Sequence, residues 1–207
     1  MQTKKIQVAS ATADVSRAMK ESKDLAQKLQ LSEKSSLRLQ LLTEELLALP
    51  RAMVGEFSAE FWLENTGQTC QLHLDMTANM NYYKRQDMIQ ASTSKKNSAE
   101  ESFFDKLRDF VEDALFSQDT LDSYTSESAS NLLVFYGANR AQYGISWSLS
   151  QYKSELEHAE ETDELDAAWE ELKQSMLARI ADDVQVAAKG NQVHLVVKKT
   201  FPDMKTA

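Results

Sequence analysis

The chain has 207 residues, which is enough for one large domain or for one domain with an insertion. Its hydrophobic content of 42% and charged content of 27% are typical of a folded globular protein. The formal net charge of -9 argues against binding to nucleic acid or to an anionic membrane, because no basic stretch offsets it.

The cysteine and histidine content excludes several kinds of site. Cys70 is the single cysteine, so neither an intrachain disulfide nor a cysteine-based zinc cluster can form. The three histidines, His73, His158 and His194, lack the spacing of metal ligands, and we expect no metal site on this basis. The sequence has no apolar run of membrane-spanning length and no secretion signal, so we expect a cytoplasmic protein away from membranes.

The first quarter of the chain predicts a strand followed by two helices. Residues 4–10 fit a short strand, residues 13–29 an amphipathic helix, and residues 36–53 a more apolar helix. One apolar stripe, which we expect to lie on a sheet, runs along the second helix: Leu39, Leu42, Leu46, Leu49 and Met53. Pro50 predicts a kink or an early stop in this helix, and Gly55 predicts its end.

The clearest hairpin follows this helix. Residues 56–64 and 70–76 each alternate apolar and polar side chains, and a glycine-containing turn over residues 65–68 joins them. Cys70 falls on the apolar side, which indicates a packed thiol rather than a nucleophile. His73 and Asp75 share the polar side of the second strand, and a solvated or partly covered face is the favoured interpretation of His73.

Polar residues dominate positions 77–98, and a loop of this length is usually functional or disordered. A lid over a bound ligand would lie here. A capping box at Ser98 to Glu101 predicts the start of a helix that runs through Leu115. Residues 117–131 fit a linker or an exposed loop. Residues 132–136 form a short apolar run whose pattern does not distinguish a helix from a strand.

The C-terminal part predicts two more helices and a second hairpin. We expect helices over residues 148–161 and 163–180, although the alternation from Tyr143 to Leu149 also fits a strand. Residues 183–188 and 192–201 predict a hairpin across a glycine-containing turn.

This order of elements, together with the segment Leu41-Leu42-Thr43-Glu44, resembles the GHKL ATPases, the family that includes histidine-kinase ATP-binding domains, anti-sigma-factor kinases, gyrase B and MutL. The resemblance covers about residues 30–115 and is nearest in style to bacterial anti-sigma-factor serine kinases. It implies an α+β fold, a two-layer sandwich with a mixed sheet and helices on one face. Residues 1–207 would form a single domain, with a core at 30–115, an inserted helical segment at 117–182 and a C-terminal hairpin at 183–201 that returns to the sheet.

The resemblance assigns the catalytic base to Glu44, with Glu45 as the alternative. In the family this glutamate is followed four positions later by an asparagine that binds magnesium, but the corresponding positions here are Ala48 and Leu49. The missing ligand makes Mg²⁺ and phosphoryl transfer doubtful, because that chemistry relies on the metal to neutralise developing charge. From the pattern alone, the two glutamates fit a solvated acidic turn.

The resemblance also assigns nucleotide-binding residues. Asp75 stands where the family has the aspartate that accepts from the adenine amino group, followed by Thr77 and Asn79, but both glycines of the Asp-x-Gly-x-Gly motif are missing. The side chains implied to hold phosphates lie in the lid: Thr93, Ser94, Lys95, Lys96 and Asn97. Glu100 and Glu101 begin the next helix and would repel phosphate, so a solvated loop is the alternative.

Two functions are consistent with these observations. The first is a bacterial regulatory protein that binds ATP or ADP, with ATPase or serine kinase activity left open, and with a regulatory protein or a second copy of the chain as partner. The second is a non-catalytic interaction module that keeps the fold without ATP. In both, residues 117–182 are a candidate partner surface.

Overall fold

The structure is a computed structural model. It describes nine parts of the chain: residues 1–9, 12–53, 57–78, 107, 110, 139–141, 144–159, 162–189 and 191–204. The predictions for Asn79, for the lid residues Thr93 to Asn97 and for most of the helix over 98–115 lie outside these parts.

The described elements come in the following order, with the bounds given for each: β1 (Ile6–Ala9), α1 (Thr12–Lys28), α2 (Glu33–Met53), β2 (Phe57–Thr66), β3 (Thr69–Ala78), β4 (Asn139–Ala141), β5 (Gly144–Ser148), α6 (Leu149–His158), α7 (Asp163–Gln174), α8 (Met176–Ile180), β6 (Asp183–Lys189) and β7 (Gln192–Thr200). The predicted strand, two helices and hairpin at the N-terminal end are therefore confirmed.

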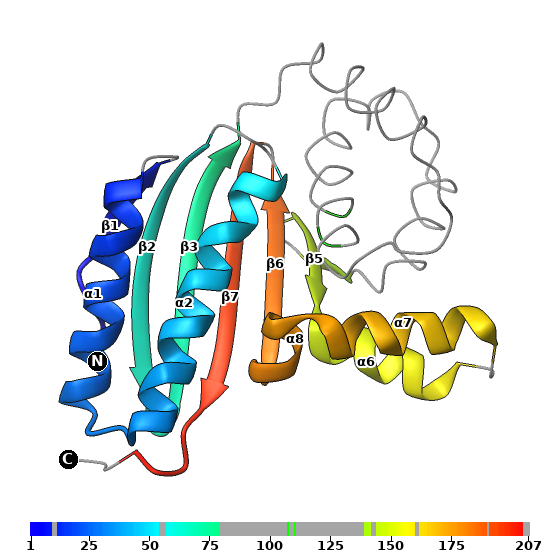
Figure 1. The fold of residues 1–207 in the computed structure, drawn as a ribbon. Coiled ribbons are helices and arrows are strands. Elements are labelled where there is room, and N and C mark those ends of the chain that lie inside the picture. Colours follow the sequence, from blue (N-terminus) through cyan, green and yellow to red (C-terminus); the bar gives the residue numbers. More distant parts are fainter. Residues whose placement is uncertain are drawn as a thin grey trace.

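The seven described strands form one sheet in the order β1-β2-β3-β7-β6-β5-β4 (Figure 1). Every pairing in it is antiparallel. The α+β class is confirmed, but the expectation of a mixed sheet was wrong for the described strands. Short turns join β2 to β3 and β6 to β7, and such hairpins give only antiparallel pairs. The two hairpins then meet through β3 and β7, again antiparallel.

The main core lies between this sheet and the helices α1 and α2, which run side by side across one face (Figure 1). The stripe predicted on α2 is buried here, with Leu39, Leu42, Leu46 and Leu49 all at 0% exposure. The strand residues that alternate toward these helices are also buried; they include Phe61, Leu63, Leu72, Leu74, Leu195 and Val197. Figure 1 shows no described helix across the opposite face of β2, β3 and β7, which we call the open face.

Several predicted boundaries differ from the structure. Helix α2 continues through Pro50 to Met53, so the early stop was wrong. The helix expected over residues 163–180 breaks at Ser175, whose backbone is extended and whose hydroxyl accepts a hydrogen bond from the Ala178 N–H, capping α8.

The region around residue 148 combines both alternatives, because β5 ends at Ser148 and α6 begins at Leu149. The segment 117–182 is therefore not helical throughout. Its strands β4 and β5 extend the sheet beyond β6.

Two local features fix the ends of these elements. Gly67 has a φ of 61°, the left-handed conformation that the tight turn between β2 and β3 requires.

Near the C-terminus, the Asp203 carboxylate accepts from the Ser32 N–H at 3.1 Å and from the Ser35 hydroxyl at 2.8 Å. Hydrogen bonds from Ser32 and Ser35 lower the pKa of Asp203 to about 2. The end of the chain is thereby tied to the start of α2.

Candidate functional site

The structure separates the two carboxylates that the sequence placed in one site. Leu74 and Met76 of β3 point toward the helices, so the intervening Asp75 points to the open face. Glu44 is exposed on α2, which covers the other face. Glu45 beside it is half-buried, and burial, followed by the neighbouring Glu44 charge, raises its pKa. The sheet therefore lies between Glu44 and Asp75.

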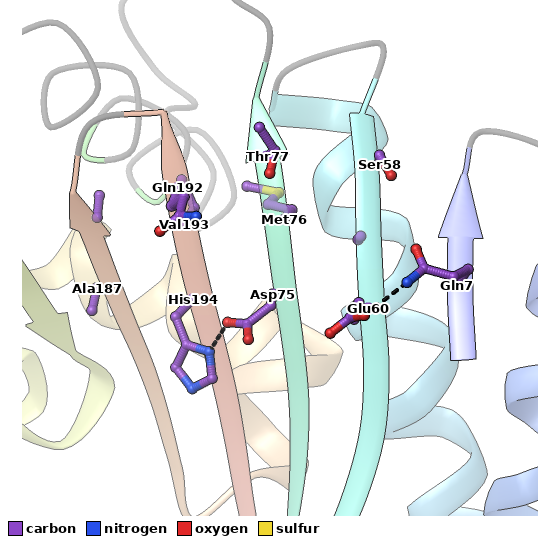
Figure 2. Close-up of a pocket in the computed structure, with 12 residues that line it drawn as sticks. Gln7, Ser58, Glu60, Asp75, Met76, Thr77, Ala187, Gln192, Val193 and His194 are labelled. Carbon is purple, nitrogen blue, oxygen red and sulfur yellow. Dashed lines mark hydrogen bonds and ion pairs between the residues drawn. The ribbon is translucent and has the colours of Figure 1, made fainter. Parts of the chain in front are cut away.

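Asp75 belongs to a row of side chains that crosses five strands of the open face. The strand register places them opposite one another in the order Gln7, Glu60, Asp75, His194 and Ala187. Figure 2 shows Asp75 turned toward His194 and Gln7 turned toward Glu60. We call these five residues the central row.

The two carboxylates of the central row are held by neighbours on their outer sides. Glu60 accepts from the Lys5 ammonium at 2.9 Å and from the Gln7 side-chain amide at 2.8 Å. Asp75 is paired with Nδ1 of His194 on the next strand. Glu60 and Asp75 face each other directly across β2 and β3, where like charges are unfavourable. The outer partners offset part of this repulsion and fix both carboxylates in place.

Beside the central row lies a groove of about 570 Å³ on the open face. Its walls combine the central row with a second row of polar side chains, formed by Ser58, Thr77 and Gln192. Ala187 leaves the β6 side of the groove unfilled, because its side chain is a single methyl group. The groove is therefore concave, with hydrogen-bond acceptors along these two rows. The other residues of its lining are apolar: Ala59, Met76, Ala188 and Val193.

On its other side, the central row borders a cluster of rings. Trp62 and His73 stack with their centroids 4.8 Å apart and their planes at 1°. His194 lies tilted against both rings, at 5.9 Å from Trp62 and 5.6 Å from His73. The Lys5 ammonium sits 4.4 Å from the centre of a Trp62 ring, a cation-π contact. His194 thus belongs to both the groove and the ring cluster.

His73 is the buried member of this cluster. It is 9% exposed, and neither ring nitrogen has a hydrogen-bond partner among the described residues. Burial, followed by the nearby His194, lowers its pKa, while the Glu64 carboxylate 3.7 Å away acts in the opposite direction. Of the two expected environments of His73, the solvated face was wrong, because Trp62 stacks on the ring and covers it.

Other predicted features have clear places in the structure. Cys70 is fully buried on the core side of β3, and burial raises its pKa to about 11, so the prediction of a packed thiol is confirmed. In the described ranges, no group of three or more histidine, cysteine or acidic side chains could hold a metal ion. No helix in the described part of the chain is long and apolar enough to span a bilayer.

The sequence found part of this site and missed the rest. Asp75 and Thr77, both predicted to bind a cofactor, line the groove. Glu60 was missed, although the alternation of the first hairpin already placed it on the same face as Asp75. His194 carried no local signal, because its pairing with Asp75 joins strands 119 residues apart in the chain.

Comparison with known proteins adds no relative to this description. No protein family, no curated protein and no solved structure matches the chain.

Proposed function

We propose that this chain is a non-catalytic binding protein that recognises its ligand or partner through the groove on the open face. The observation that carries this proposal is the central row, in which Glu60 and Asp75 are fixed by neighbours at the wall of a groove of about 570 Å³. Ligand pockets typically enclose about 300–1,000 Å³ and contain a few polar groups held in place by the fold. The groove meets both conditions.

The position of Glu44 supports binding rather than phosphoryl transfer. Transfer of a phosphoryl group needs a base, a metal and a nucleotide at one place. Glu44 lies across the sheet from Asp75 and Thr77. A ligand in the groove would therefore meet no base from α2.

Nuclear magnetic resonance can test this proposal by screening several ligand classes at once. We would record backbone amide spectra with a small library that contains organic cations, organic anions, sugars and nucleotides. We expect shifts for residues of the central row and their neighbours on β2, β3 and β7. Shifts confined to α1 and α2, or no shifts with any compound at millimolar concentration, would contradict the proposal.

Nucleotide binding is the second candidate function, and the position of Asp75 and Thr77 in one groove favours it. His194 pairs with one oxygen of the Asp75 carboxylate, and the other oxygen could accept from the amino group of a base. The phosphates would extend out of the groove, because Glu60 and Asp75 would repel them. This function corresponds to the GHKL-like regulator that the sequence resembles.

Calorimetry with ATP and ADP, with and without magnesium, tests this second candidate. We expect saturable binding that Asp75→Asn removes and Glu44→Ala preserves, with the thermal midpoint of the free protein nearly unchanged in both variants. Absence of binding at millimolar nucleotide would reject nucleotide recognition and leave the non-catalytic binding protein. Turnover that Glu44→Ala abolishes would instead restore Glu44 as a base.

A further inference from the structure

We propose that the groove binds an organic cation, whose ammonium or guanidinium group lies between Glu60 and Asp75. This inference rests on the proposed function of the groove and names the chemistry of its ligand. Glu60 and Asp75 are directly opposite each other on adjacent strands and on the same face. In that arrangement, side chains of like charge repel each other, and a cation placed between them removes the repulsion.

Each carboxylate is paired with one described cation. Lys5, the residue before β1, bonds to Glu60, and His194 of β7 pairs with Asp75, so the two cations belong to segments on either side of β2 and β3. The pKa of Lys5 also shows the effect of the negative charges of Glu60 and Asp75. The hydrogen bond to Glu60 raises the pKa of Lys5, and the charges of Glu60 and Asp75 act in the same direction.

The remaining groups of the groove suit the same ligand. Ser58 and Thr77 contribute hydroxyls, and Gln7 donates to Glu60 through its amide nitrogen, which leaves its amide oxygen as an acceptor. An ammonium group carries three donors and a guanidinium group five, and both bond strongly to carboxylates. Donors on the ligand therefore meet acceptors on the polar side chains of the groove, and the apolar residues of its lining can contact the carbon atoms of the ligand.

The arrangement argues against two other ligand classes. A phosphate or carboxylate ligand would have to approach two carboxylates at close range. A metal ion usually needs three or more protein ligands, and the described residues place no such group here. The groove volume of about 570 Å³ also exceeds the space that a bare ion occupies. A small organic cation fits both the charge and the size.

Agmatine, which carries one guanidinium and one ammonium group, is a suitable probe for calorimetry at low ionic strength. We expect saturable binding to the full chain, weakened by about tenfold or more in Glu60→Gln and in Asp75→Asn. Each variant removes one carboxylate and keeps the shape of the side chain. Glu44→Gln makes the same change of net charge on the far side of the sheet and should bind agmatine as the unmodified protein does.

Equal weakening in Glu44→Gln would overturn the inference, because attraction to the net negative charge would then explain the binding. Absence of agmatine binding would also overturn it. If other compounds of the screen still shift the amide signals of residues on the open face, the proposed function survives. If no compound does, both fail. The thermal midpoint of each variant shows whether a loss of binding comes from unfolding. Because Glu60→Gln and Asp75→Asn are independent, the test still works if one of the two variants does not fold.

A second arm identifies the source of the cation. The peptide Gly-Arg-Gly presents the guanidinium group as a partner protein would, and agmatine presents it as a free amine would. Tighter binding of the peptide supports a basic side chain of a partner, and tighter binding of agmatine supports a free polyamine. Both outcomes support a cation site, whereas failure of both probes to bind overturns it.

Discussion

His73 shows how a single residue on the open face affects the stability of the whole chain. Its ring is buried against Trp62, and in the part of the chain that the structure describes neither ring nitrogen forms a hydrogen bond. Burial lowers its pKa from the ordinary value of 6.5, so the folded protein favours the neutral ring. In the pH range between the folded pKa and 6.5, the unfolded chain binds more protons than the folded one. The free energy of unfolding therefore rises with pH across that range.

His73→Phe tests this linkage. Phenylalanine can stack on Trp62 and cannot be protonated, so the loss of stability on acidification between about pH 7 and pH 5 should become smaller. Thermal midpoints of both proteins across this range provide the measurement. The same variant made at the exposed His158 is the control and should keep the original pH dependence. If His73→Phe keeps it as well, His73 is not the group responsible.

Asp203 makes stability depend on pH in the same direction but at lower pH, since its pKa is lowered to about 2 by hydrogen bonds from Ser32 and Ser35. Its stabilising effect is fully present above the unfolded pKa of about 3.9 and is lost as the pH falls through about 2. Asp203→Ala should lower the thermal midpoint at neutral pH, and the difference from the unmodified protein should shrink in strong acid. Asp166→Ala, a substitution of an exposed acid on α7, should change the midpoint little. A midpoint unchanged at neutral pH in Asp203→Ala would show that this tie is not stabilising.

Among the elements, α2 makes the central contact of the core. Leu42 is fully buried between α2 and the sheet, whereas Leu37 of the same helix is 57% exposed. We expect Leu42→Ala to reduce the free energy of unfolding by about 2–5 kcal/mol, because it removes buried methyl groups and leaves a cavity. Leu37→Ala should change it by about 0.5 kcal/mol or less. Denaturant unfolding measures both, and equal effects would contradict the assigned orientation of α2.

The same elements show what the sequence could predict. Steps of three and four residues predicted which face of α2 is buried, and strict alternation predicted the hairpin of β2 and β3, because both signals are local. The pairing of β3 with β7 joins segments more than a hundred residues apart, and no local pattern contains it. For the same reason the sequence suggested Asp75 but not His194. The break at Ser175 was missed because apolar residues continue at helical spacing through α7 and α8.

At the scale of the whole molecule, the sheet divides the described chain into two sides with different roles. One side carries α1, α2 and the apolar core (Figure 1). The other carries the groove and the central row (Figure 2). The ring cluster lies on the same side. A ligand in the groove would therefore leave the core contacts in place. This division predicts that a bound ligand changes the environment of side chains on the open face and leaves that of the core side chains unchanged.

The three tryptophans of the chain allow this division to be measured directly. Trp62 lies in the ring cluster next to His194, Trp147 is buried on the helix side of the sheet, and Trp169 lies on α7. We would label the protein with 5-fluorotryptophan, assign the Trp62 signal with Trp62→Phe, and titrate with agmatine and with ATP while recording fluorine spectra. We predict that a ligand which binds shifts the Trp62 signal and leaves those of Trp147 and Trp169 in place. A saturable shift of Trp147 or Trp169 with Trp62 unchanged would contradict the division of the sheet into a core side and a binding side.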